Sequence, residues 1–292
     1  MEPLASKSLE QPDFLLRTLM LFPHPSISLW RAIEAREVWK EFRIQELGTP
    51  VLDLGCGDGR FSTAVFDGAR IDIGVDISPN VVFAAKGSSG YGHLMTGDGS
   101  KLPFQDGVFE TVFSNSVLEH IPNVPDVLGE VRRVLKAGGT FVFTVPSPNF
   151  SRFLLLPSMF WRIPLLNSLA RWYSKKRNLL LAHNNICELE VWRKWLEYAG
   201  FQEIQGRFCL SKVTLLVWDV MALTIYLIRF PLRGNPQILN VSLRRSQKLR
   251  VFLLSNLLRV FYLSNSTEGA DMIITAGTPQ QAMKLGTSTQ RA

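Results

Sequence analysis

The chain of 292 residues is long enough for one α/β domain with sizeable additions, and its three cysteines are too few and too scattered for a disulfide framework or a cysteine zinc cluster. They indicate a reduced, cytoplasmic protein. The net charge of +7 is uneven, because residues 151–265 hold 17 basic and 5 acidic residues (+12) while the rest of the chain sums to −5. This asymmetry predicts an appended basic element that meets anionic groups.

The N-terminal segment, residues 1–47, is expected to be helical. It lacks a signal-peptide pattern, because the apolar stretch 14–22 is short and interrupted by an arginine. Residues 26–47 place apolar side chains at helical spacing, which predicts an amphipathic helix that packs across a sheet or over a ligand. We expect Arg31 and Glu34 on this helix to be solvated surface charges, although both could reach a substrate.

A glycine-rich turn follows the first predicted strand. Residues 51–59 read Val-Leu-Asp-Leu-Gly-Cys-Gly-Asp-Gly and run into a helical pattern. A turn of this kind lets a ligand approach the backbone, and the helix N-terminus offers free N–H groups to an anion. A dinucleotide site would need its third glycine at the position of Arg60, and the carboxylate of Asp53 would repel a pyrophosphate. Asp53 instead suits a ligand that carries an ammonium group.

Polar residues also end the next strands. Asp76 follows the strand-like stretch 71–75, and a carboxylate at that place can accept both hydroxyls of a ribose. Asp98 lies between two glycines after the third strand, and the fourth strand, 109–114, ends in small polar residues. Because the ligand of a parallel α/β sheet lies over the carboxyl ends of the strands, these groups are expected to surround one site.

In this order the motifs resemble those of the class I S-adenosylmethionine-dependent methyltransferases, whose first motif has the form D-x-G-x-G-x-G. The resemblance covers residues 48–146 and, more loosely, 191–201 and 269–276. It implies a Rossmann-like fold with a mostly parallel, seven-stranded sheet and helices on both faces. It also places Asp98 at the adenine amine of S-adenosylmethionine and the end of the fourth strand at its methionine part. The predicted cofactor-binding residues are Asp53, Gly55, Cys56, Gly57, Gly59, Asp76, Ile77, Asp98, Gly99, Ser114 and Asn115.

Two histidines are candidates for a catalytic base. Methyl transfer from a sulfonium is an in-line displacement in which the protein mainly positions the reactants, so no fixed triad is expected. An oxygen acceptor would benefit from a base, and His120 and His183 are the candidates, with His183 preferred. Some quinone-pathway relatives hold a metal with an E-x-x-E-H pattern near His120. Here Ser116 replaces the first Glu of that pattern, so no metal is predicted.

Strands are expected at 50–54, 71–75, 92–96, 109–114 and 139–145, with helices near 58–67, 79–86 and 125–135. This alternation predicts a parallel sheet with right-handed crossovers in the cofactor-binding core, 48–146. Residues 147–208 are assigned to the same domain as a helical lid followed by a return helix and strand, and 266–279 to the last strand.

Residues 209–265 are predicted to form an apolar and basic helical insertion before the last strand. The apolar run 213–228 has 16 residues and contains Asp219, so it is too short and too polar to span a bilayer. A second apolar run, 251–263, is shorter still. Two apolar helices around a basic loop favour peripheral contact with a membrane or a lipid-like substrate; packing in the core or lid, and dimerisation, are the alternatives. Residues 280–292 are expected to be a disordered tail.

The sequence thus predicts an enzyme that transfers a methyl group from S-adenosylmethionine to a small, hydrophobic or lipid-linked acceptor, at an oxygen. We expect it in the cytoplasm, associated with the inner face of a membrane. Nucleic acid is disfavoured as a partner, because residues 114–117 read Ser-Asn-Ser-Val where base-amine methyltransferases carry an N/D-P-P-aromatic motif. A non-catalytic binding or scaffold protein at a membrane surface is a further alternative.

Overall fold

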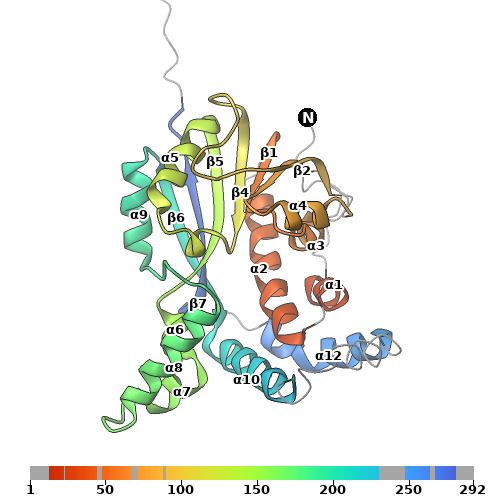
Figure 1. The fold of residues 1–292 in the computed structure, drawn as a ribbon, viewed down its shortest axis with the longest axis vertical. Coiled ribbons are helices and arrows are strands. Elements are labelled where there is room, and N and C mark those ends of the chain that lie inside the picture. The colour runs from red at the N-terminus through yellow and green to blue at the C-terminus, as the bar shows by residue number, and fades with distance from the viewer. Residues whose placement is uncertain are drawn as a thin grey trace, which may run out of the picture.

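The computed structural model describes residues 13–22, 24–44, 48–66, 71–87, 90–229, 247–263 and 267–280. A seven-stranded sheet forms its centre, in the order β3–β2–β1–β4–β5–β7–β6 (Figure 1). The strands are β1 (Val51–Leu54), β2 (Ile71–Asp76), β3 (Tyr91–Thr96), β4 (Phe109–Asn115), β5 (Leu135–Pro146), β6 (Gln202–Ser211) and β7 (Gly269–Gly277). β1 to β5 are parallel, and β7 runs antiparallel to both of its neighbours, β5 and β6. The predicted mostly parallel, seven-stranded sheet is confirmed.

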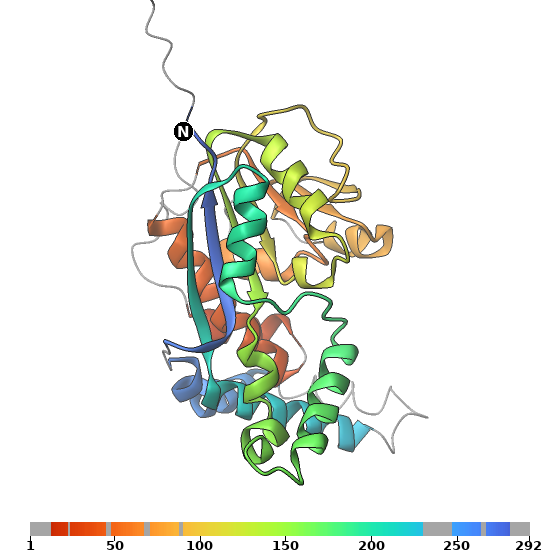
Figure 2. The same ribbon diagram turned by 90° about the vertical axis from the view of Figure 1, so that its left-hand side faces the viewer.

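Helices cover both faces of this sheet, as the turned view shows (Figure 2). The helices are α1 (Phe14–Leu21), α2 (Pro25–Ile44), α3 (Arg60–Phe66), α4 (Pro79–Ala85), α5 (Val124–Val134), α6 (Asn149–Phe153), α7 (Leu155–Phe160), α8 (Asn167–Leu180), α9 (Leu189–Tyr198), α10 (Lys212–Arg229) and α12 (Gln247–Tyr262), with the 3-10 turn η1 (Leu118–His120). α5 and α9 pack on one face around Trp192, and α1, α2 and α3 pack on the other around Phe113. The sheet is therefore buried on both faces, which explains its apolar strands.

The N-terminal helix differs from its prediction. α2 begins at Pro25 and is described to Ile44, and a separate α1 precedes it. Asp13 caps α1, because its side chain accepts a hydrogen bond from the Leu16 amide (3.1 Å). The predicted stretch 45–47 lies outside the described residues, as do 281–292 of the predicted tail and 230–246 of the insertion.

The two insertion helices belong to the core of one face rather than standing apart from it. Leu215 and Trp218 of α10, and Leu258 and Tyr262 of α12, are buried against α1 and α2. The two helices also leave apolar side chains exposed. Within the described part of the chain, no helix combines the length and the apolar character that crossing a bilayer needs.

A buried carboxylate on α10 of the insertion holds α7 and α8, two helices of the predicted lid. Asp219 of α10 has no exposed surface, and it accepts hydrogen bonds from the Tyr173 hydroxyl (2.8 Å) and the Leu155 amide (3.0 Å). Its other oxygen lies 3.0 Å from Nη2 of Arg177. A buried charge is tolerated only when it is paired in this way. Asp219, whose charge made a membrane-spanning helix unfavourable in the sequence, thus holds α7 and α8 to α10.

Candidate active site

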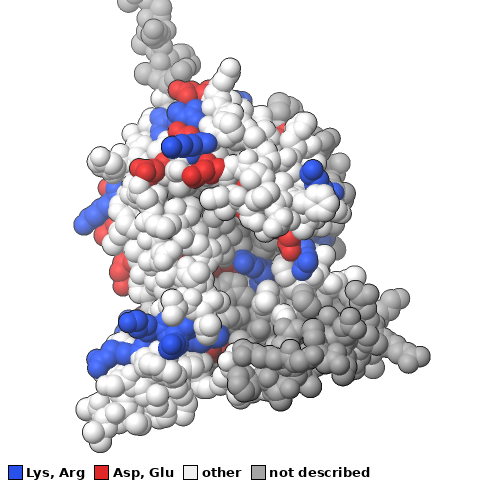
Figure 3. Space-filling view, viewed as in Figure 1, with Lys and Arg blue, Asp and Glu red and all other residues white. Residues whose placement is uncertain are grey.

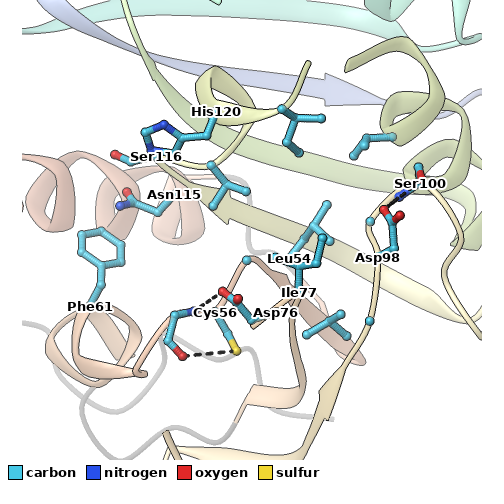
Figure 4. A pocket seen from close by; sticks show the side chains of 18 of the residues that line it. Leu54, Cys56, Phe61, Asp76, Ile77, Asp98, Ser100, Asn115, Ser116 and His120 are labelled. Carbon is cyan, nitrogen blue, oxygen red and sulfur yellow. Dashed lines mark hydrogen bonds between the residues drawn. The ribbon is translucent and has the colours of Figure 1, made fainter. Parts of the chain in front are cut away.

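A cavity of about 740 Å³, here called the large cavity, opens at the carboxyl ends of β1, β2 and β4. The predicted cofactor-binding residues that line it are Gly55, Cys56, Gly57, Asp76, Ile77, Asp98, Gly99 and Asn115. Figure 4 shows them spread along it, with Asp98 at one end, Asp76 in the middle and Asn115 at the other. An elongated ligand would therefore meet these three polar side chains in succession.

The glycine turn forms the floor of the large cavity. The amides of Gly55 and Cys56 both donate to the Val75 carbonyl, at 2.7 and 3.0 Å, so the turn is tied to β2. Gly55 and Gly57 have φ angles of 76° and 56°, in the left-handed region where glycine carries no steric penalty. Added at Gly55, a Cβ atom would also collide with the side chain of Val117, so the turn needs glycine there for two reasons.

Asp76 ends β2 with both carboxylate oxygens held in place. Oδ2 accepts from the Gly57 amide (3.0 Å) and Oδ1 from the Ser78 amide (2.9 Å). Each oxygen keeps a further acceptor site, because a carboxylate offers about four lone-pair positions. A pair of neighbouring hydroxyls could thus bind both oxygens of Asp76 without any movement of the loop.

Asp98 lies at the far end of the large cavity in a tight turn. Its Oδ1 accepts from both the amide (2.8 Å) and the hydroxyl (2.9 Å) of Ser100. These hydrogen bonds lower the pKa of Asp98, so its carboxylate stays ionised near neutral pH. The second oxygen can accept from an amine on a ligand.

At the opposite end, α2 is locked to the end of β4 by a buried polar cluster that the sequence did not reveal. Glu34 has no exposed surface, and it accepts from Ser116 Oγ (2.6 Å) and from Nη1 of Arg31 (2.7 Å). The same Arg31 nitrogen also donates to Ser116 Oγ (2.9 Å), and its guanidinium lies over the ring of Phe61. The expectation that Arg31 and Glu34 are solvated surface charges is wrong, because α2 turns both toward the sheet. Arg31 lines the large cavity and presents positive charge there.

Three of the predicted cofactor residues do not line the large cavity. Asp53 is buried beneath the glycine turn, where it accepts from the hydroxyls of Ser62 and Tyr91, each at 2.5 Å. Burial raises its pKa to about 6. Ser114 is also fully buried and donates to the Leu54 carbonyl (2.8 Å), and Gly59 begins the turn into α3. These residues shape the loops, and the structure gives none of them a face toward a ligand.

A second cavity of about 250 Å³, here called the small cavity, adjoins the large one. The two cavities share the wall residues Arg31, Ser116 and His120. The rest of the small cavity is lined mainly by apolar and aromatic side chains from α2, α10, the end of β5 and the segment after α8, namely Ile27, Trp30, Trp218, Pro146 and Leu181, together with Glu119 and His183. The small cavity thus combines an apolar wall with the polar side chains of Arg31, Ser116, Glu119, His120 and His183.

The two candidate histidines have different surroundings. His120 lies at the junction of the cavities, and its Nδ1 is 3.0 Å from the Ala182 carbonyl. A proton on Nδ1 satisfies that contact and leaves Nε2 as an acceptor. His183 lines only the small cavity, and burial, with His120 nearby, lowers its pKa to about 4. His120 thus lies where the two cavities meet, whereas His183, the candidate preferred from the sequence, lines only the small cavity.

Glu119 is the acidic residue of the small cavity. It is almost fully buried, its Oε2 has no hydrogen-bond partner, and burial raises its pKa to about 8. It is therefore a neutral acid at pH 7 and can donate a proton to a hydrogen bond. The part of the chain that the structure describes contains no group of three or more His, Cys, Asp or Glu side chains arranged to hold a metal ion.

Comparison with known proteins agrees with this geometry. Residues 52–143 match the methyltransferase domain family. The chain is 38% identical over 98 residues to a sterol 4-C-methyltransferase of Caenorhabditis elegans, which covers 31% of this chain and 29% of that protein. It is 32% identical over 134 residues to a demethylmenaquinone methyltransferase of Symbiobacterium thermophilum, which covers 41% of this chain and 53% of that protein. In both cases the match spans less than two thirds of the relative.

The fold matches over a longer stretch than the sequence does. An S-adenosylmethionine-dependent methyltransferase of Thermotoga maritima superimposes with a TM-score of 0.51 at 16% identity, over 85% of this chain and 90% of that one. At this identity the likeness shows the fold alone. The seven-stranded, mostly parallel sheet with helices on both faces matches the Rossmann-like fold of that structure.

Proposed function

We propose that this chain, whose residues 52–143 form a class I S-adenosylmethionine-dependent methyltransferase domain, transfers a methyl group from that cofactor to a hydroxyl oxygen of a small, hydrophobic acceptor. The observation that carries the proposal is that the large and small cavities share one wall, at Arg31, Ser116 and His120. A donor in the first and an acceptor in the second would meet at that wall.

The residues of the large cavity fit S-adenosylmethionine. Asp98 would accept from the adenine amine, and Asp76 would accept both ribose hydroxyls. Arg31, which donates to Ser116 at the end of the cavity opposite Asp98, would attract the carboxylate of the methionine part, and Asn115 lies beside Ser116. The cofactor supplies an activated methyl group on sulfur, and the protein has to hold the acceptor in line with it.

His120 is the residue best placed to take the proton of the acceptor hydroxyl. Its Nδ1 is engaged by the Ala182 carbonyl, so Nε2 is the nitrogen that can accept that proton. Glu119, as a neutral acid, would donate a hydrogen bond to a polar group of the acceptor and so orient it. His183 would stay neutral and pack against the ring of Phe150. In this reaction the oxygen–methyl bond forms, the sulfur–methyl bond breaks, and the hydroxyl proton passes to His120.

The walls of the small cavity support an acceptor with a flat, apolar part. Trp30 and Trp218 meet edge to face at 5.2 Å between ring centroids, and both line the cavity. The two relatives named above are a sterol 4-C-methyltransferase and a demethylmenaquinone methyltransferase, so each acts on a lipid that contains rings. We propose a lipid-like acceptor for this chain on the same grounds. We also propose that the protein is cytoplasmic, because its three cysteines are free thiols, as is usual in that compartment.

The insertion helices are candidates for contact with the inner face of a membrane. α10 exposes Tyr226 and Leu227, and α12 exposes Phe252, Leu257 and Val260. On α12 the exposed side chains lie opposite the buried Val251, Leu258 and Tyr262, as in a helix that lies in an interface. Contact of 209–265 with a second subunit would use the same side chains.

The test is transfer of radiolabelled methyl groups from S-adenosylmethionine into lipid extracts. We expect label in an organic-soluble product with the parent protein and none with the Asp76→Ala variant. The product should lose its label under conditions that cleave methyl ethers. Label on a carbon or nitrogen would contradict the oxygen acceptor, and no transfer by a protein that binds the cofactor would favour the binding-protein alternative.

A further inference from the structure

The lid carries an apolar tip that nothing in the protein covers within the described residues. α7 and α8 form a hairpin that projects from the lower end of the molecule (Figure 1). At the turn between them Trp161, Ile163 and Leu165 are exposed, Leu165 by 93%. Monomeric proteins rarely expose several large apolar side chains side by side without a partner for them.

Basic side chains gather directly beside this tip. Arg162 lies within the turn, and Arg171, Lys175 and Lys176 are exposed along α8. Figure 3 shows Lys and Arg as a band over α6 and α8, with uncharged surface beneath the band on the face that is drawn. The sequence has no Asp or Glu between residues 131 and 187, so no negative charge of this segment offsets the band. The hairpin thus ends in exposed apolar side chains. The basic side chains of Arg171, Lys175 and Lys176, here called the basic collar, lie between this tip and the rest of the molecule.

The hairpin is held firmly to the rest of the molecule. Asp219 binds Tyr173 and Arg177 of α8 as described above, and Asn178 of α8 donates to Ser151 Oγ of α6 (2.9 Å). These contacts fix the orientation of the tip before it meets anything. Little conformational freedom would be lost when the tip binds, which favours a weak but specific surface contact.

We propose that residues 161–165 insert into the interfacial layer of a lipid bilayer that contains anionic lipids, with the basic collar of α8 on the headgroups. Tryptophan prefers this layer, and the flanking Arg and Lys supply the attraction to negative headgroups. A protein partner of the tip would have to be acidic around an apolar pocket, whereas an anionic bilayer offers both features everywhere. The bilayer is therefore the partner that fits this surface most simply.

This inference goes beyond the methyl transfer proposed above and does not depend on it. It does connect the two, because α8 ends at Leu180 and the next residues include Leu181 and His183, which line the small cavity. The segment that directly follows the hairpin therefore forms part of the wall of the acceptor site. The tip is a separate surface from the exposed faces of α10 and α12 (Figure 1).

The experiment is flotation of the full-length protein with vesicles of phosphatidylcholine alone and of phosphatidylcholine mixed with phosphatidylglycerol. We expect the parent to float only with the mixed vesicles, and less at high salt. Leu165→Glu should lower the bound fraction by at least about tenfold, because it removes the burial of one leucine and adds a negative charge. The double variant Lys175→Glu/Lys176→Glu should lower binding and weaken its salt dependence.

Tyr198→Glu is the matched control, because Tyr198 is 90% exposed on α9, away from the hairpin. It should float like the parent, and all variants should keep the parent's thermal midpoint and its affinity for S-adenosylhomocysteine. Failure of the parent to bind mixed vesicles, or flotation of Leu165→Glu at the parent's level, would overturn the proposal. So would a dimer of the parent that Leu165→Glu dissociates, because that result assigns the tip to self-association.

Discussion

The large and the small cavity adjoin each other but are built in different ways. The large cavity is lined mostly by short loops that directly follow β1, β2, β3 and β4, and these loops are tied to the sheet by backbone hydrogen bonds. The small cavity draws on α2, α10 and the end of α8, which are far apart in the chain. Its shape depends on side-chain contacts such as the Asp219 anchor.

This difference separates what each cavity can be expected to do. A site made by strand-end loops keeps its geometry as long as the sheet is folded, which suits one fixed cofactor. A site made where distant helices meet can change with those helices while the sheet stays the same, which suits a variable acceptor. Variants of the two regions should therefore have separable effects on cofactor binding, turnover and stability.

The largest effect is expected at the junction of the cavities. His120→Gln should lower kcat for methyl transfer by about 10²–10⁴-fold, the usual contribution of a general base, with little change in the affinity for S-adenosylhomocysteine. His183→Gln is the matched comparison, and it should lower kcat by less than about tenfold, because a neutral packing histidine takes no proton. Steady-state kinetics with the identified acceptor measure both. Equal losses in the two variants, or a larger loss at His183, would contradict the assignment of the base.

The next prediction concerns the stability of the fold and the buried carboxylate of Asp219, which holds α7 and α8 to α10. Asp219→Ala leaves Arg177 largely buried without its partner, so it should lower the free energy of unfolding by about 3–5 kcal/mol. Urea unfolding measures this change. Glu190→Ala is the control, because Glu190 pairs with Arg193 on the exposed face of α9 and its loss should cost less than about 1 kcal/mol. A folded Asp219→Ala protein of parental stability would show that the lid does not depend on this anchor.

A smaller effect concerns the pH dependence of stability. Because burial raises the pKa of Glu119 from its ordinary 4.5 to about 8, the folded protein keeps a proton that the unfolded chain has lost. Stability should therefore fall as pH rises through this window, with a contribution of up to about 1.4 kcal/mol per pH unit. Glu119→Gln should remove that contribution. Urea unfolding of the parent and the variant across the window gives the difference, and parallel pH profiles would show that Glu119 is ionised in the folded state.

Many residues of the large cavity could be predicted from the sequence. The glycine turn, Asp76 and Asp98 lie at the ends of strands that hydrophobic patterning locates, so their meeting follows from the topology of a parallel sheet. Asp53 is the exception, since a motif alone does not show that Ser62 and Tyr91 satisfy it beneath the turn.

The polar cluster between α2 and β4 could not be predicted in the same way. Arg31 and Glu34 stand three residues apart on an amphipathic helix, a spacing that is typical of solvated ion pairs. Only the packing of α2 against the sheet brings them to Ser116, more than 80 residues away in the chain. The sequence also could not show that His120 contacts Ala182. That contact joins η1 to the residues after α8 and exists only once the chain is folded.

The most direct test of the central claim is calorimetric titration of S-adenosylhomocysteine into the parent, Asp76→Ala and Asp106→Ala. Asp106 is an exposed carboxylate paired with Arg133, outside the large cavity, so its variant controls for the loss of a charge. The account predicts micromolar binding by the parent and by Asp106→Ala, and a loss of at least about 100-fold in Asp76→Ala, since two charge-assisted hydrogen bonds disappear. A folded parent that does not bind, or an Asp76→Ala variant that binds as tightly as the parent, would contradict it.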